Sequence, residues 1–550
     1  MTFMNILKIS AAAIIAWSAG PRATADEKAL EADVVVYGDA AGGVTAAVQA
    51  ARMGRKTILI THYGHLGGMS GSGLGFSDIG NPAILGGLSR EFYHRIYQHY
   101  MNDAAWTHES RSRFKNAGQG TLAFDPKTEL ASTFEPKVAE GVFDAMAREA
   151  GVRVIRGRLD LANGVEKPAA RITAIRLEGG VAVRGGMFID ASYEGDLLAA
   201  AGVSFVIGRE PNSKYGETGN GITGPGKQNQ LPNGIDPWVV KGDASSGLLP
   251  GVNPDMDGQV GEGDSRLQAY CYRMVLTNVP DNRVPVPKPA DYDPATYEIL
   301  FRAIEAGQKD GFFKLSRVPN HKTDSNNTGG ISCDWIGGNY GRDWNWATLD
   351  HKQRDALAAR HRDWQLGLVW TLQNHPRVPE SIRKNVTGWG LAKDEFPDNK
   401  NWPYQLYVRE ARRMVSDFVM TENHCKRKLP VEDPVGMGAY TLDSHHVQRI
   451  VSNGMVKNEG DIQTHLGGKP YGISFRSIMP RAAECENLLV PWALSSTHIA
   501  FGSIRMEPVF MVLGQSAATA ACLAIEANTA VQAVPYQDLR ARLIQDGQQL

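Results

Sequence analysis

Three histidines and one arginine in the last fifth of the chain have the chemistry needed for proton transfer. His498 lies in the stretch STHIAFGSIRMEP, and His445 and His446 lie together in LDSHHVQR. A neutral imidazole accepts a proton near pH 7, so His498 is the first candidate for a catalytic base and the other two are second candidates. Arg505 could hold a substrate oxygen or pair with Glu507. The alternative for each histidine is a structural role, in which the ring bonds a loop carbonyl.

A turn near the N-terminus has most of the pattern of a dinucleotide-binding loop. Such loops read G-x-G-x-x-G, and this chain has Gly38, Ala40 and Gly43 at the three positions. The first glycine permits the bend and the third lets helix and strand pack closely, whereas the methyl group of Ala40 only narrows the approach of a pyrophosphate. The amides that begin the next helix then face the phosphates. The turn is predicted within a βαβ unit made of a strand at 34–37, a helix at 44–53 and a strand at 57–60.

Two further features indicate which dinucleotide this is. The acid that usually binds a ribose hydroxyl at the end of the second strand is replaced by Thr61 and His62, so the adenosine end needs a different grip. A second glycine-rich run, HLGGMSGSGLGFSD from His65 to Asp78, follows directly. A nicotinamide cofactor does not need this run, but it suits the longer FAD, whose second half continues past the pyrophosphate. An ordinary flexible loop is the alternative.

The rest of the chain alternates between two kinds of sequence. Helix and strand patterns of α/β type occupy both ends, whereas prolines, tryptophans and polar loops dominate the middle. We therefore predict an FAD-binding domain at 26–204 and 469–550, interrupted by a substrate domain at 205–468. The elements predicted outside the βαβ unit are helices at 137–150, 356–373, 405–421 and 507–527 and strands at 152–156, 187–189 and 486–494.

Several stretches resemble one bacterial FAD-dependent oxidoreductase family, from about Asp33 to Glu526. They include YGDAAGGVTAA, HLGGMSGSGLG, FIDASYEGDLLAAAGVSFVIGRE, LYVREARRMVSDFVMTE and STHIAFGSIRMEPVFMVLGQSAATAA. That family is grouped with the flavin subunit of heterodisulfide reductase, and some members are labelled xanthan lyase. The resemblance implies an α/β fold: a glutathione-reductase-type FAD domain, with a Rossmann-like parallel sheet and a small β-meander, that carries an inserted α+β substrate domain.

The resemblance also assigns residues to the cofactor. The turn at 38–43 would meet the pyrophosphate, and Arg505, Met506 and Glu507 would lie beside the flavin pyrimidine, where the start of a helix favours negative charge on reduced flavin. Pro491-Trp492 depart from the Gly-Asp pair that many flavoproteins place against the ribityl chain. The other assigned residues are Gly67, Gly68, Met69 and Gly73 along the ribityl chain or ring, and Asp190 and Ala191 at the end of the strand below the FAD.

Composition and the N-terminus limit the partners and the location. The 58 basic and 59 acidic side chains give a formal charge of −1, which offers no global field for nucleic acid. Lys8, the apolar run at 9–19 and Ala23-Thr24-Ala25 predict a signal peptide at 1–25 and export to the periplasm or beyond, with a buried N-terminal helix as the alternative. No stretch of the remaining chain is expected to span a membrane. The five cysteines contain no C-x-x-C pair, so neither an iron–sulfur cluster nor another metal site is predicted.

The middle of the chain suggests the substrate. Flat aromatic rings among hydrogen-bonding groups suit sugar rings, although buried packing of the same rings is the alternative. The segment REARRM at 409–414 either binds an acidic group or forms a solvated helix. The residues in question are Trp335, Tyr340, Trp344 and Trp346, with Asn326, Asn327, Asp334 and Asp343.

Together these features predict an exported FAD-dependent oxidoreductase. It would take two electrons from a small organic substrate, such as a carbohydrate or a derivative, and pass them to an acceptor of unknown kind. His62 or His65 could attach the flavin covalently. Two other functions stay open: a flavin-containing lyase or isomerase, and a carbohydrate-binding protein whose nucleotide fold has lost its chemistry.

Overall fold

A mostly parallel sheet built from both ends of the chain forms the centre of the protein. The computed structural model describes residues 29–119 and 121–550, so the signal peptide predicted at 1–25 lies outside the described residues. The strands run in the order β5-β2-β1-β8-β7-β6, and β25 pairs with the second half of β8. Their bounds are β5 (Arg153–Arg156), β2 (Thr57–Thr61), β1 (Leu30–Tyr37), β8 (Ala182–Asp190), β7 (Ala174–Arg176), β6 (Val165–Glu166) and β25 (Leu488–Leu489).

The central strand β1 has a paired strand along each edge, and its second half, Val34 to Tyr37, is buried. Val35 pairs in register with Ile58 of β2 on one side and with Phe188 of β8 on the other, and both pairings are parallel. A run of β-branched residues is typical of such a strand because both of its faces pack against apolar groups. The three strands predicted in the βαβ unit and at 187–189 are confirmed, whereas β6, β7 and β8 pair antiparallel and form a small meander at one side.

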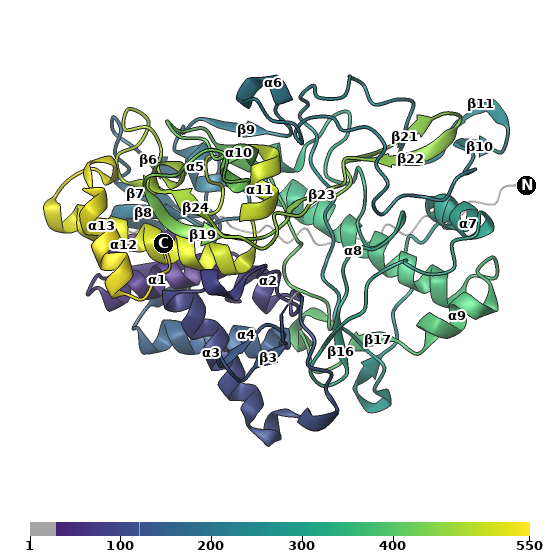
Figure 1. The fold of residues 1–550 in the computed structure, drawn as a ribbon, viewed down its shortest axis with the longest axis horizontal. Helices are drawn as coiled ribbons and strands as arrows, with labels where there is room; N and C mark the ends of the chain where they lie inside the picture. The colour runs from purple at the N-terminus through teal and green to yellow at the C-terminus, as the bar shows by residue number, and fades with distance from the viewer. Residues whose placement is uncertain (1–28, 120) are drawn as a thin grey trace, which may run out of the picture.

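Two helices from opposite ends of the chain pack closely against each other on one face of this sheet. They are α1 (Ala41–Arg52) and α12 (Glu507–Ala527), the purple and yellow helices side by side in Figure 1. A Cβ atom on Gly514 would lie 2.0 Å from the carbonyl oxygen of Gly42, so only glycine permits this approach. Among the described residues, α12 alone is long and apolar enough to cross a membrane, contrary to the prediction that no stretch would be. However, 89% of its apolar window is buried inside the protein.

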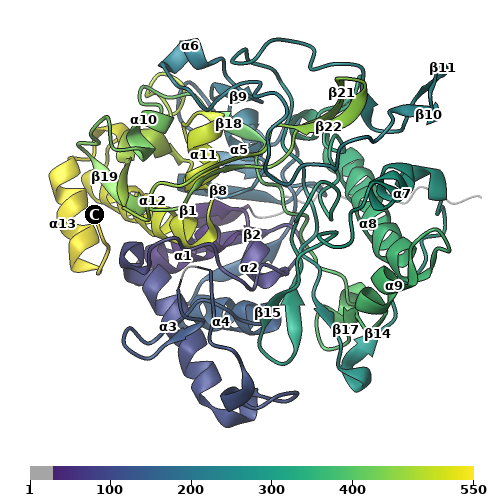
Figure 2. The ribbon, with the colours of Figure 1, turned by 45° about the vertical axis from the view of Figure 1, so that its right-hand side comes forward.

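Much of the middle of the chain lies beside this sheet, on the right of Figures 1 and 2. It contains the long helix α8 (His351–Asn374) and a five-stranded antiparallel sheet. Buried apolar side chains of both parts join in one continuous core, and the domain boundaries at 205 and 468 stay a prediction. The sheet is made of β14 (Arg283–Val284), β17 (Gly390–Ala392), β13 (Leu276–Thr277), β16 (Lys322–Asp324) and β15 (Ser316–Val318).

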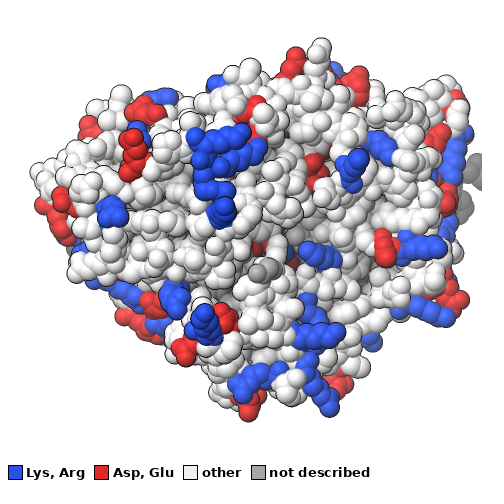
Figure 3. Space-filling model, viewed as in Figure 1, with Lys and Arg blue, Asp and Glu red and all other residues white. Residues whose placement is uncertain are grey.

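The remaining helices lie around these two sheets. Helix α4 confirms the helix predicted at 137–150. On the face seen in Figure 3, charged side chains of both signs are scattered over a largely uncharged surface, with one group of basic side chains above the centre. The five cysteines are all buried and none forms a disulfide in the part of the chain that the structure describes. The other helices of eight or more residues are α3 (Gly87–Met101), α4 (Pro136–Glu149), α7 (Glu298–Glu305), α9 (Glu380–Thr387) and α13 (Tyr536–Gln545).

The helix predicted at 405–421 is wrong. The segment is extended and contains β18 (Arg412–Met414), which pairs antiparallel with β9 (Phe205–Ile207). Two of its arginines are fully buried: Arg409 lies 3.0 Å from Asp334, and Arg413 lies 2.6 Å from Glu210. These partners come from distant parts of the chain, and their ion pairs outweigh the weak helical preference of the segment. The strand predicted at 486–494 is likewise reduced to the two residues of β25.

A buried lysine joins the two parts of the molecule. The ammonium of Lys322 on β16 lies 2.7 Å from Glu135 before α4, 2.7 Å from Asp394 and 2.6 Å from Glu395. These three carboxylates are close enough together to hold a metal ion, but Lys322 already supplies the positive charge at their centre. Removing that charge would leave several buried carboxylates uncompensated.

We predict that Lys322→Met lowers the free energy of unfolding by about 3–5 kcal/mol because it breaks a buried ion pair network. The control is Lys384→Met, which breaks the exposed pair with Glu380 at 2.8 Å and should cost at most about 1 kcal/mol. Chemical denaturation of both variants measures the difference. Equal effects of the two substitutions would contradict this account of the cluster.

Candidate functional site

The glycine turn is pressed against the end of strand β8. Gly38 has a φ of +115°, and a Cβ atom there would lie 2.4 Å from the backbone of Ala191. A Cβ atom on Gly43 would lie 2.1 Å from the carbonyl oxygen of Gly38. Both positions therefore require glycine, as the dinucleotide pattern predicts. The amide of Gly67 donates to the carbonyl of Asp39 at 2.9 Å, so the two glycine-rich runs lie side by side.

An acid does lie at the end of β2, but it comes from the turn. The carboxylate of Asp39 accepts hydrogen bonds from the hydroxyl of Thr61 at 2.7 Å and the amide of His62 at 3.0 Å. Burial, followed by the charge of Arg158, lowers the pKa of His62 to about 3, so its ring is neutral. Thr61 and His62 thus lie where they were predicted, and Asp39 supplies the negative charge that β2 itself lacks. The sequence contained this acid, but its position within the turn concealed it.

The start of helix α12 meets the start of helix α1. The carboxylate of Glu507 accepts hydrogen bonds from the amide of Ala41 and, at 2.9 Å, from the hydroxyl of Tyr193. The same hydroxyl accepts from the amide of Met69 at 2.8 Å. A helix N-terminus attracts anions, and here a carboxylate of the protein takes the place that a phosphate would take. Four predicted cofactor regions (the turn, the second glycine run, the end of β8 and the start of α12) therefore converge on one point.

This point passes a test of fit for a dinucleotide by its donors and acceptors. Buried polar atoms without a partner surround it: Oε2 of Glu507, Oγ of Ser70 and Nε1 of Trp492. Such atoms are rare in folded proteins unless a ligand or water completes them. The cavity beside the turn measures only about 40 Å³, far below the roughly 300–1,000 Å³ of small-molecule sites. Side chains that line this cavity, such as Tyr193, must therefore move when a dinucleotide binds.

The remaining predicted cofactor residues have structural contacts. The carboxylate of Asp190 accepts from the amides of Ser192 and Leu198, which fixes the segment after β8. A Cβ atom on Gly68 would lie 2.2 Å from the Tyr193 hydroxyl, and one on Gly73 would lie 1.9 Å from the backbone of Arg273. Met506 is the residue before α12. His65 faces away from the turn: its ring is 2.7 Å from Glu140 and stacks on Tyr404.

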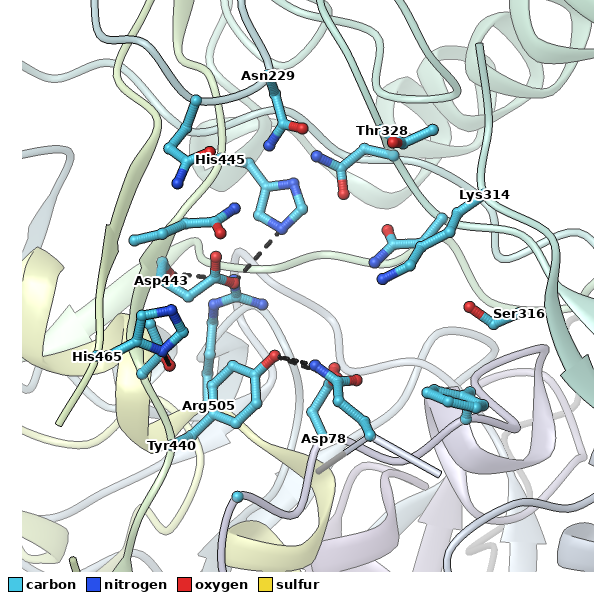
Figure 4. A pocket seen from close by; sticks show the side chains of 18 of the residues that line it. Asp78, Asn229, Lys314, Ser316, Thr328, Tyr440, Asp443, His445, His465 and Arg505 are labelled. Atoms are coloured by element: carbon cyan, nitrogen blue, oxygen red, sulfur yellow. Dashed lines mark hydrogen bonds and ion pairs between the residues drawn. The ribbon is translucent and has the colours of Figure 1, made fainter. Parts of the chain in front are cut away.

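A cavity of about 680 Å³ includes in its lining the residue two positions before Glu507 (Figure 4). Arg505 lines it, and its guanidinium lies 2.8 Å from both the carboxylate of Asp443 and the hydroxyl of Tyr407. Residues 505 and 507 are at most about 7 Å apart along the chain, so the backbone of one residue that lines the cavity is close to the start of α12. The other charged or ring-bearing residues that line the cavity include Asp78, Arg273, Lys314, Tyr440, His445 and His465, and its amide side chains include Gln119, Gln228, Asn229, Asn326, Asn327 and Gln463.

His445 is the histidine best placed for proton transfer in this cavity. Its Nδ1 lies 2.7 Å from Asp334, and its Nε2 lies 3.5 Å from Asp443 inside the cavity (Figure 4). Burial and Arg409 lower the pKa of His445, but Asp334 and Asp443 together outweigh them, so the net pKa is raised. The ring is therefore held in place on one side and faces the cavity on the other.

Two of the three candidate histidines, His498 and His446, do not line this cavity. The ring of His498 is fully buried, with Nδ1 2.7 Å from Glu410 and Nε2 3.0 Å from the hydroxyl of Ser444. The ring of His446 bonds the carbonyl of Asn229 at 2.9 Å, and burial lowers its pKa. His498 and His446 thus have the contacts of structural residues, whereas His445 reaches the cavity. Asp78, Tyr440 and Asp443 were not foreseen, although Asp78 ends the second glycine run.

The aromatic residues predicted to bind sugar separate into two environments. Trp346 is buried, and its Nε1 lies 3.3 Å from Glu194. Trp335, Tyr340 and Trp344 instead line a second cleft, of about 1,020 Å³. The helix expected for REARRM does not exist, and its arginines pair with buried acids rather than with solvent.

Three solved structures that resemble part of this chain are remote in sequence. The 3-ketosteroid-Δ4-(5α)-dehydrogenase of Rhodococcus jostii RHA1 is 19% identical, over 32% of this chain and 50% of its own, with a TM-score of 0.21. The L-proline dehydrogenase of P. horikoshii is 18% identical, over 33% and 59%, with a TM-score of 0.23. The L-amino acid deaminase of Proteus vulgaris is 18% identical, over 36% and 56%, with a TM-score of 0.22.

The matched regions cover between half and three fifths of those three proteins. No curated protein sequence matches the chain. The sequence profile described as FAD dependent oxidoreductase, in contrast, matches residues 33–543. That range begins at the first strand of the sheet, includes both glycine runs and Arg505, and ends in α13. The chain therefore belongs to the FAD-dependent oxidoreductase family and is an enzyme that uses FAD as its cofactor.

Proposed function

We propose that the enzyme oxidises a polyhydroxylated substrate, a carbohydrate or a derivative, in the 680 Å³ cavity, and that it works after export. The observation that carries this proposal is the cavity lining. Its lining includes a histidine held between two carboxylates, an arginine and six amide side chains. Amides offer both donors and acceptors, which suits a ligand with many hydroxyl groups. The predicted signal peptide supports export, and the electron acceptor stays unidentified.

The residues of the cavity divide the work of oxidising an alcohol. Bound FAD supplies the acceptor for two electrons, taken from the substrate as a hydride. His445, once deprotonated, takes the hydroxyl proton at Nε2. The guanidinium of Arg505 and Nε2 of His445 both contact the carboxylate of Asp443. Arg505 can therefore hold the substrate oxygen while the proton leaves. Asp334 fixes the ring by accepting from Nδ1.

At the other end of the site, Asp39 and the helix start hold the cofactor. Asp39 offers its carboxylate at the end of β2, where a ribose hydroxyl is bound in related sites. The Ala41 amide that Glu507 occupies becomes available to the pyrophosphate once the Glu507 side chain moves. The inserted substrate domain is part of this proposal, since the cavity lies between residues of the terminal parts, such as Arg505, and residues of the middle, such as Asn326.

We predict that at least one sugar, polyol or uronate bleaches the visible absorbance of the FAD-loaded enzyme when mixed anaerobically. His445→Gln should slow this bleaching by about 10²–10⁴-fold, because a general base typically contributes that factor. Stopped-flow absorbance measures the rate.

The control for this test is His498→Gln. This substitution should lower the melting temperature, whereas it should not act on the chemical step alone. If no sugar, polyol or uronate bleaches the flavin, the carbohydrate proposal is wrong. If His498→Gln, at full stability, slows bleaching while His445→Gln does not, the assignment of the base is reversed.

We predict that kcat/KM for an uncharged substrate rises with pH as His445 loses its proton, with a midpoint above the usual histidine pKa of about 6.5. Asp443→Asn removes a carboxylate that stabilises the imidazolium, so the pKa of His445 falls and the rising limb moves to lower pH. A pH profile of both proteins measures the shift. A limb that stays in place in Asp443→Asn would show that another group controls the rate.

We predict that FAD binds more weakly at high pH because of Glu507. Burial raises the pKa of Glu507 to about 8, and its ionised form competes with the pyrophosphate for the start of α1. If only the protonated form admits FAD, the Kd rises about tenfold between pH 7 and pH 9. Glu507→Gln keeps the hydrogen bonds but cannot ionise, so its Kd should stay nearly constant. Flavin fluorescence titrations test this, and an equal pH dependence in both proteins would contradict it.

A further inference from the structure

The 1,020 Å³ cleft is separate from the cavity assigned to oxidation. One segment of the chain lies between the two: Asn326 and Asn327 line the oxidation cavity, and Ile331 and Trp335 line the cleft. The volume is at the upper end of the range for small-molecule sites, so the cleft has room for more than one sugar ring. Its lining contains four aromatic rings, among them Trp335 and Trp344, four arginines, among them Arg360 and Arg449, and three aspartates.

Two tryptophans present flat surfaces in this cleft because glycines support them. A Cβ atom on Gly341 would lie 2.3 Å from the ring of Trp344, and one on Gly338 would lie 2.5 Å from the ring of Trp335. Trp344 is 37% exposed, and in the described part of the chain no other ring and no cation lies over it. An exposed indole whose back rests on glycine backbone has one free face. Sugar rings stack on such faces through their apolar C–H groups.

An arginine without a partner lies in the same cleft. Arg449 on β21 (Gln448–Ser452) is only 5% exposed, its Nη2 has no hydrogen-bond partner, and its Nε bonds Asn458 at 3.2 Å. Among the ion pairs of the described residues, none includes Arg449, whereas every other arginine buried to this degree has a carboxylate within 4.0 Å. Burial lowers the pKa of Arg449 to about 10, so the side chain still carries its charge near pH 7.

None of the three acids that line the cleft forms an ion pair with Arg449 among the described residues. Asp264 pairs with Arg209, Asp257 pairs with Arg266 at 3.2 Å, and Asp343 is the third acid. Arg360 lies over the ring of Trp335 at 5.3 Å and has no ion pair among the described residues. Asp334 raises the pKa of Arg449 but forms no ion pair with it, and burial has the larger effect. A buried charge without an ion-pair partner lowers stability, and a ligand of opposite charge would offset that cost. The four arginines of the lining outnumber its three aspartates, which favours an anionic ligand over a cationic one.

We propose that this cleft binds an acidic oligosaccharide, with a sugar ring stacked on Trp344 and a carboxylate of the saccharide paired with the guanidinium of Arg449. Arginine suits this role because its planar fork matches a carboxylate and forms two parallel hydrogen bonds. The cleft is a binding site and needs no redox step. It therefore does not depend on the oxidation proposed for the other cavity, although it would hold a long substrate near it.

The test uses the full-length, FAD-loaded protein and isothermal titration calorimetry with tetragalacturonate. We expect binding of tetragalacturonate and at least tenfold weaker binding of its fully methyl-esterified form, which keeps the sugar rings but lacks the charge. Trp344→Ala should weaken binding at least tenfold. Gly341→Ala should do the same while keeping the tryptophan, because the added methyl group displaces the ring. Phe205→Ala is the matched control: it removes an aromatic ring that is 39% exposed but lies outside the cleft, and binding should not change.

Arg449→Gln separates a ligand-binding role from a structural one. A structural arginine would lower the melting temperature when replaced, whereas an uncompensated one leaves it unchanged or raises it. We expect Arg449→Gln to weaken tetragalacturonate binding at least tenfold with no loss in melting temperature.

The proposal is overturned if the methyl ester binds as tightly as the acid, if Trp344→Ala binds like the original protein, or if Arg449→Gln melts earlier and binds normally. His445→Gln should bind tetragalacturonate normally, so a failure of the oxidation proposal leaves this result unchanged.

Discussion

The contact between Gly42 of α1 and Gly514 of α12 is the constraint on which the rest of the site depends. With a Cβ atom at position 514, the distance to the Gly42 carbonyl oxygen would be 2.0 Å, so any side chain would push the helices apart. This close approach joins the two ends of the chain over the parallel sheet. It places Glu507 at the start of α1 and, two residues earlier, Arg505 at the wall of the oxidation cavity. The cofactor turn and the substrate cavity are therefore held at a fixed separation by three consecutive residues.

Buried ion pairs stabilise the cavity wall, as regular secondary structure stabilises the region of the parallel sheet. The wall consists of extended segments, whose polar groups cannot all be satisfied by a regular ladder. Arg273 forms two bonds of 2.6 Å to Asp324, Arg413 joins Glu210 to Glu410, and Arg409 reaches Asp334. Charge-assisted bonds of this kind are strong and directional. Asp334 belongs both to this framework and to His445, so the network that shapes the wall also orients the ring. His498 belongs to the framework through Glu410.

Local patterns predicted what local forces decide. The βαβ unit, α4 and α12 lie where periodicity and glycines placed them, since a buried parallel strand and an apolar helix carry their signal in consecutive residues. The helix predicted at 405–421 was wrong because the partners of Arg409 and Arg413 lie up to 203 residues away along the chain. The site shows the same limit. The turn was found from its glycines, but Asp39 was hidden because the acid that serves β2 is not on β2. His498 was favoured over His445 by its closeness to Arg505 along the chain, and only the structure shows that Glu410 and Ser444 occupy both of its nitrogens.

Unpartnered polar atoms of opposite sign indicate two different ligands. Beside the glycine turn the atom without a partner is a carboxyl oxygen of Glu507. Burial raises the pKa of Glu507 to about 8, so the group is mostly protonated near neutral pH. In the cleft the atom without a partner is Nη2 of Arg449. The guanidinium of Arg449 keeps its charge near neutral pH. A site that must admit a pyrophosphate gains from an acid that can become neutral, since an ionised one would repel the ligand. A site that must attract a carboxylate gains from a base that cannot. The residue type at each place therefore matches the charge of the ligand inferred there.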